Sequence, residues 1–93
     1  MTKSQKACRA IRSARSESQV IAAVRGYLDS LDASDAALLP GELLVLGLVP
    51  AEEVIQTALQ ALHQVTDAAA RGGVVKETAL VFSTAARRLA AMA

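Results

Sequence analysis

The side chains best suited to chemistry in this sequence are its single histidine and its single cysteine. His63 is followed four residues later by Asp67, and residues four apart lie on the same face of a helix. With Cys8 and further carboxylates this pair could form a metal site, and a Cys8–His63 pair could activate a thiolate nucleophile. A His–Asp pair on a helix is usually only a solvated surface pair, and Cys8 lies on the segment that we expect to be least ordered. We therefore predict no metal site and no nucleophile.

Two other patterns are explained by helix ends and not by chemistry. Glu52 and Glu53 could be paired acid–base carboxylates, but adjacent residues on a helix point about 100° apart. Both fit the first turn of a helix, where the helix dipole favours negative charge. The sequence ARGGVV, residues 70–75, lacks the lysine and the spacing of a phosphate-binding loop. The sequence thus predicts a protein that is not an enzyme and binds no cofactor.

The composition limits the core that could position any site. The chain has 93 residues and is 53% hydrophobic, but 20 of the hydrophobic residues are alanines, and Tyr27 and Phe82 are the only aromatic residues. Alanine removes little apolar area from water, so a domain of this kind gains stability from a partner or a second copy. A lone cysteine fits a reducing compartment. No secretory signal or membrane-spanning apolar run is visible, and we expect a cytoplasmic protein.

The first main helix is predicted to begin after Ser16. Ser16 and Gln19 form a capping-box pattern, and the helix should end near the sequence LDASD, residues 31–35. Ser34 can then cap a short turn over residues 35–39. The apolar stripe of the helix comprises residues three or four apart, Ile21, Val24, Leu28 and Leu31, widened by Val20 and Tyr27.

The C-terminal half carries the two clearest helix patterns. Pro50 suits the first position of a helix that ends at Arg71, before Gly72-Gly73, and residues 75–93 repeat the same spacing. Two such helices joined by Gly-Gly predict an antiparallel hairpin. We therefore predict an all-α fold, a small helical bundle of three main helices with a C-terminal antiparallel helical hairpin and an apolar connector. The two stripes are Ala51, Ile55, Ala58, Leu62, Val65 and Ala69, and Val75, Ala79, Phe82, Ala86, Leu89 and Ala93.

Residues 1–15 form a basic arm, which we separate from a single helical domain at 16–93. Residues 1–16 carry five bases and no acid, whereas the rest of the chain carries five bases and nine acids. Ala7, Ile11 and Ala14 have helical spacing, so the arm could add a turn or two to the next helix. The bases wind around such a helix and leave no strong apolar face, so we expect a frayed helix or disorder. The arm could bind nucleic acid through its bases, Lys3, Lys6, Arg9, Arg12 and Arg15.

The connector LLPGELLVLGLVP, residues 38–50, is unusually apolar. It is too short to span a bilayer, and a lone strand would leave backbone groups unpaired, so we prefer a short helix from Gly41 to Leu46 that ends at Gly47. The connector could fill the core of an alanine-rich bundle, or it could expose an apolar patch to a partner. The candidate partner-binding residues are Leu43, Leu44, Val45, Leu46, Leu48 and Val49.

Four segments resemble those of a known group of proteins: VIAAVRGYLDSL, ALLP, VPAEEVIQTAL and TALVFSTAARRLA. In this order they are similar to a group of small, uncharacterised proteobacterial all-helical proteins. The resemblance covers about residues 20–92 and implies a helical fold. It implies no function, because the group has none that can be carried over.

These observations predict a small non-catalytic helical interaction or regulatory protein. We expect it to act through an apolar surface, with an unidentified protein partner, and to self-associate as a homodimer, the commonest oligomer. A nucleic-acid-associated regulator that uses the basic arm is the alternative. No membrane association is expected.

Overall fold

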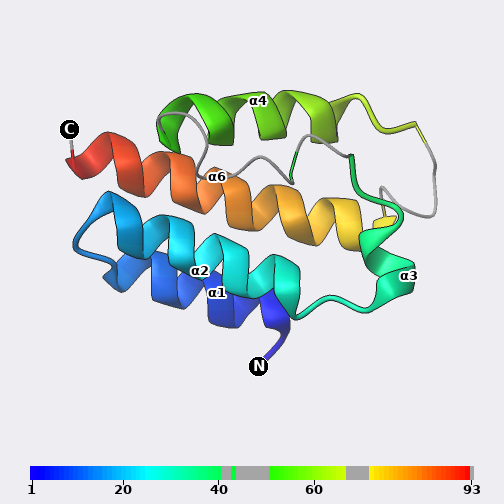
Figure 1. The fold of residues 1–93 in the computed structure, drawn as a ribbon, viewed down its shortest axis with the longest axis horizontal. Coiled ribbons are helices and arrows are strands. Elements are labelled where there is room, and N and C mark those ends of the chain that lie inside the picture. The colour runs from blue at the N-terminus through cyan, green and yellow to red at the C-terminus, as the bar shows by residue number, and fades with distance from the viewer. Residues whose placement is uncertain (41–42, 44–50, 67–71, 93) are drawn as a thin grey trace.

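The computed structural model describes residues 1–40, 43, 51–66 and 72–92 of the chain. These residues contain five helices and no strand, which confirms the all-α prediction (Figure 1). The helices are α1 Lys3–Ser13, α2 Glu17–Asp29, α3 Ala33–Ala36, α4 Ala51–His63 and α6 Val74–Met92.

Helix α6 lies at the centre of the molecule. It runs between α4 on one side and the pair α1 and α2 on the other, and it contacts all three (Figure 1). α1 and α6 run in one direction, and α2 and α4 run in the opposite direction. Because it has neighbours on several sides, α6 buries more of its circumference than the predicted stripe. Its buried residues are Val75, Thr78, Val81, Phe82, Thr84, Ala85 and Leu89.

Residues Lys3–Ser13 form the capped helix α1, in the arm for which a frayed helix or disorder was predicted. Thr2 caps this helix through a reciprocal pair of bonds with Gln5: the Thr2 hydroxyl accepts from the Gln5 N–H at 3.1 Å, and the Gln5 side chain accepts from the Thr2 N–H at 3.0 Å. Ala7, Cys8 and Ile11 are buried against the rest of the protein. The small apolar residues suffice because they let α1 approach α6 closely. Among the described residues, four helices have 11 residues or more, where three main helices were predicted.

The chain turns sharply between α1 and α2, so the two helices are not continuous. Ala14 ends α1 with extended backbone, and the Ser16 side chain caps α2 by accepting from the Gln19 N–H at 3.2 Å. Arg88 of α6 holds this turn, because its Nε and Nη2 donate to the Ala14 carbonyl at 2.9 and 2.6 Å. Arg88 is half-buried, whereas its neighbour Arg87 is exposed.

Helix α4 is shorter than the sequence pattern predicts. It begins at Ala51, whose N–H donates to the Glu17 carboxylate of α2 at 3.1 Å, and it ends at His63 and not at Arg71. Val65 lies beyond the end of α4 and is half-buried. It therefore continues the apolar spacing of the sequence, although the helix itself has ended. Residues 67–71 lie outside the described residues. The short turn predicted for 35–39 with a Ser34 cap is instead the helix α3, which follows Asp32.

Candidate binding groove between α1 and α2

An open groove of about 490 Å³ runs between α1 and α2. This volume is within the range of ligand-binding pockets, about 300–1,000 Å³. Its floor consists of small residues from both helices, Ala7 and Ala10 of α1 and Ala23 and Gly26 of α2. Its remaining lining residues are Lys3, Lys6, Tyr27 and Ser30. We call this feature the α1–α2 groove.

The sequence creates the groove by placing small residues three apart on both helices. Residues three apart share one face of a helix, and both pairs, Ala7 with Ala10 and Ala23 with Gly26, line the groove. Gly26 is exposed, and a Cβ atom built there would meet nothing within 4 Å, so the groove is open to solvent at this position. The groove can therefore accept a side chain from outside without displacing the core.

Two lysines stand on the α1 wall of the groove, and they are placed differently. Lys3 reaches across to α2, where its Nζ donates to the Ser30 carbonyl at 2.6 Å and lies 4.0 Å from the Asp32 carboxylate. Both partners of this ion pair are exposed, so the pair itself contributes little. The Lys6 ammonium group makes no hydrogen bond or ion pair with any residue that the structure describes. Lys3 thus closes one end of the groove, and Lys6 leaves a free positive charge on its edge.

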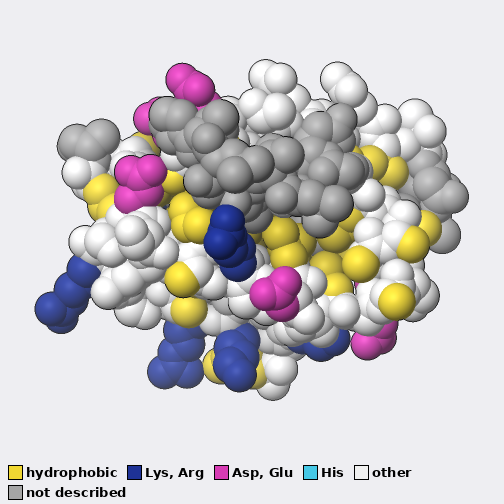
Figure 2. Space-filling model, viewed as in Figure 1, with side chains coloured by type: hydrophobic (Ala, Val, Ile, Leu, Met, Phe, Trp, Pro, Cys, Tyr) yellow, Lys and Arg dark blue, Asp and Glu magenta, His cyan; other side chains and the backbone are white. Residues whose placement is uncertain are grey.

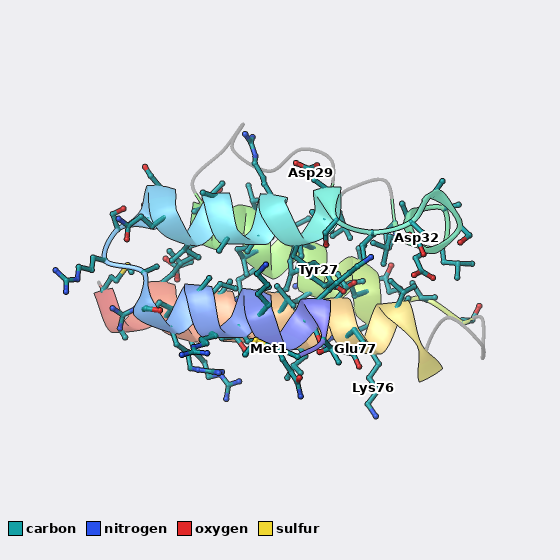
Figure 3. All side chains as sticks on the ribbon, turned by 90° about the horizontal axis from the view of Figure 1, so that it is seen from below. Met1, Tyr27, Asp29, Asp32, Lys76 and Glu77 are labelled. Atoms are coloured by element: carbon teal, nitrogen blue, oxygen red, sulfur yellow. The ribbon has the colours of Figure 1, made fainter. Side chains whose placement is uncertain are left out.

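A buried polar cluster supports the same end of the groove. Tyr27, placed between α1 and α2 in Figure 3, shares a 2.9 Å hydrogen bond with the fully buried Thr78 hydroxyl of α6. The Ser4 hydroxyl donates to the carboxylate of Glu77 in the first turn of α6. A polar cleft of about 400 Å³ adjoins this cluster, with Asp35 also in its lining. The cluster fixes the position of α1 and α2 on α6.

Burial raises the pKa of Tyr27 above its ordinary value of 10.0; the hydrogen bond from Thr78 opposes this increase, and the negative charge of Glu77 adds to it. Folded Tyr27 therefore holds its proton more tightly than unfolded Tyr27, and the resulting stabilisation is complete below pH 10.0 and lost as the pH rises above it.

We expect the free energy of unfolding to fall above pH 10.0, and to fall less steeply in Tyr27→Phe, which has no hydroxyl to ionise. At neutral pH the variant should be less stable by about 1 kcal/mol, because Thr78 loses its partner. Urea unfolding of both proteins across this pH range, followed by circular dichroism, measures the difference. Parallel pH profiles for the two proteins would contradict the prediction.

The polar side chains at this end of the groove have a structural role, because they form hydrogen bonds with one another. Among the described residues, no buried side-chain nitrogen or oxygen lacks a hydrogen-bond partner, and no group of three or more histidine, cysteine or acidic residues could hold a metal ion. His63 is exposed at the end of α4, and its predicted partner Asp67 lies outside the described residues. Cys8 is buried, and its sulfur accepts from the Thr84 hydroxyl at 3.4 Å.

The structure reaches only one of the six predicted partner-binding residues of the connector. Leu43 is 2% exposed, so it belongs to the core and not to a partner surface. Leu38, at the start of the connector, is exposed. The other five, Leu44, Val45, Leu46, Leu48 and Val49, lie outside the described residues, as does most of the short helix predicted from Gly41 to Leu46.

All five bases of the predicted nucleic-acid surface are exposed. Lys and Arg side chains project along the lower edge of the molecule in Figure 2, the side on which α1 and α2 lie. Only Lys3 and Lys6 line the α1–α2 groove. Sequence reasoning missed the groove itself, although Ala7 and Ala10 beside these lysines, and Ala23 and Gly26 on the next helix, form a recognisable small-residue pattern.

Two further observations bear on the identity of the protein. No helix in the described ranges has the length and apolar character needed to cross a membrane. The predicted resemblance to small proteobacterial helical proteins stays a prediction. No protein family model, curated protein or solved structure matches this chain.

Proposed function

We propose that this protein is a small non-catalytic helical interaction protein with a regulatory role, and that the α1–α2 groove is its binding surface. The observation that carries the proposal is the open floor of the groove at Gly26, where space for a side chain exists and no atom of the described chain fills it. An apolar concave surface that is open to solvent can be covered by an apolar group of a partner, so the groove is a candidate docking surface.

We take the occupant to be a protein segment. The groove follows two helices and is open to solvent, which suits the insertion of a helix better than the enclosure of a small molecule. Four small residues, two from each helix, surround the space that one large apolar side chain would occupy. This arrangement favours a partner that contributes a protruding leucine, methionine or phenylalanine.

The finer architecture is part of the same proposal. α4 and α6 would form an antiparallel hairpin with its turn near Gly72-Gly73, and the apolar connector would lie between α3 and α4. The opposite directions of α4 and α6 support the hairpin (Figure 1). We also propose a cytoplasmic location, supported by the single cysteine and its burial in the core.

Self-association as a homodimer through the connector is the second part of the proposal. The exposed side chain of Leu38, at the start of the connector, supports it, because this residue presents apolar surface to solvent. Light scattering coupled to size exclusion should give about twice the monomer mass of 9.7 kDa. A mass of 9.7 kDa would overturn this part and leave the groove unaffected.

The groove is tested by filling it. In Gly26→Leu the new side chain enters open space at an exposed helical position, so the fold should be retained and helix propensity improved. We expect tagged wild-type protein to capture a partner from lysate of its host, Gly26→Ala to capture the same partner, and Gly26→Leu to lose it. The interaction should then be reproduced with the purified partner. Equal capture by all three proteins would refute the groove as the binding surface.

A nucleic-acid-associated role for the bases of α1 is the second candidate. It is favoured by the order of α1, which presents all five bases to solvent from a capped helix. Binding of this kind should weaken steeply with salt, because it releases counterions from phosphates. It should also be unaffected by Gly26→Leu, which leaves every base in place.

A further inference from the structure

The charged residues that line the α1–α2 groove all have one sign. Lys3 and Lys6 line the groove, and none of the described lining residues is acidic. Lys6 is unpaired within the described chain, and the ion pair of Lys3 with Asp32 is long and exposed. A neutral apolar floor with positive charge on one wall is complementary to a surface that combines a large apolar side chain with carboxylates.

We propose, on the basis of the function proposed above, that the partner segment is an acidic amphipathic α-helix. Its large apolar side chain enters the space over Gly26, and its Asp or Glu side chains pair with Lys6 and Lys3. On a helix, a carboxylate three or four residues from the apolar side chain lies beside it on the same face. One or two turns of the partner helix therefore suffice to place its apolar side chain against the small residues of the groove and its carboxylates beside Lys3 and Lys6.

The hydrogen bond of the Lys3 ammonium group would change when the partner binds. In the free protein its ammonium group donates to the Ser30 carbonyl, a neutral acceptor, across the end of the groove. A partner carboxylate is a stronger acceptor, because hydrogen bonds between two charged groups exceed those with one. Lys3 then exchanges its bond to Ser30 for one to the partner, which opens the end of the groove along the helix.

The floor argues against nucleic acid as the occupant. A phosphate backbone would satisfy the lysines but would leave the alanine and glycine floor uncovered. Stacking of bases needs an accessible aromatic ring, and Tyr27, the aromatic residue of the groove, is 4% exposed with its hydroxyl bonded to Thr78. An acidic amphipathic helix would contact both the small apolar residues and the lysines of the groove.

The experiment uses two synthetic peptides of about 16 residues, long enough to form a helix. Both carry leucines three and four apart, and one has glutamate on its flanks where the other has lysine. Fluorescence anisotropy at low salt should show that the acidic peptide binds the full chain about threefold to tenfold more tightly than the basic peptide. Lys6→Glu should abolish or reverse this preference. Arg9→Glu, which makes the same charge change on α1 at an exposed position outside the groove lining, should preserve it.

The variants distinguish failure of the acidic-helix inference from failure of the proposed binding surface. If Gly26→Leu weakens both peptides but Lys6→Glu and Arg9→Glu reduce the acidic preference equally, the groove is used and the acidic-helix inference is wrong. If Gly26→Leu leaves the binding of both peptides unchanged, or neither peptide binds, both the inference and the proposed binding surface are wrong. Tighter binding of a single-stranded oligonucleotide, sensitive to Lys6→Glu but not to Gly26→Leu, would overturn the inference in favour of nucleic acid.

Discussion

Replacing Phe82 with alanine should lower the free energy of unfolding by about 3–5 kcal/mol, one of the largest losses available in this chain. Phe82 is fully buried and lies on α6, the helix that contacts α1, α2 and α4. Its removal leaves a cavity at the centre of the bundle, where alanine-rich neighbours have short side chains and cannot move far enough to fill it. Urea unfolding followed by circular dichroism measures the loss.

His63→Ala is the matched control for this prediction. His63 is exposed at the last position of α4, so its replacement should change the free energy of unfolding by no more than about 0.5 kcal/mol. A large loss at His63 together with a small loss at Phe82 would mean that the buried and exposed faces of these helices have been assigned the wrong way round.

The long helices of the C-terminal half could be predicted from the sequence because their apolar residues repeat over several turns. Val75, Phe82 and Leu89 have a regular spacing, and all three are buried in α6. The end of α4 could not be placed in the same way. Val65 continues the apolar stripe, but backbone hydrogen bonds from residues 64 and 65 reach only three residues back, as in a turn. Apolar spacing indicates which residues face a core, and it does not determine where the backbone leaves the helix.

Long-range polar contacts were beyond sequence reasoning for a different reason. Arg88 and Ala14 are 74 residues apart, and Tyr27 and Thr78 are 51 apart, so no local pattern relates the two members of either pair. Thr78 was not assigned to the apolar stripe because it is polar, yet the Tyr27 hydroxyl allows it to be fully buried. A buried hydroxyl depends on a partner that only the tertiary structure supplies.

The candidate groove was missed because hydrophobic patterns identify residues that fill space and not residues that leave it empty. Ala10 and Gly26 are exposed and contribute little apolar area, so a search for large apolar residues at helical spacing selects neither of them. Their importance arises from the alignment of α1 with α2, and that alignment depends on the turn at Ala14 and on the packing of both helices on α6. The lysines were identified from the sequence, but their association with an apolar floor was not.

Ile11 provides the test of whether α1 belongs to the folded core. It is fully buried on α1, in the segment for which the sequence predicted fraying or disorder. Ile11→Ala should therefore lower the free energy of unfolding by about 2–5 kcal/mol, as expected for a large aliphatic residue in a packed interior. If residues 1–15 were instead frayed, the same substitution would change the free energy by less than about 0.5 kcal/mol.

Arg12→Ala, at the next position on the same helix, separates burial from helix propensity. Arg12 is exposed, so its replacement by the strongest helix former should change stability by no more than about 0.5 kcal/mol. A large loss at Ile11 with little change at Arg12 would require a packed apolar face on α1. Such a face is also what holds α1 beside α2 and keeps the groove between them in shape, so equal and small effects at both positions would remove the basis for the groove as well as for the fourth helix of the bundle.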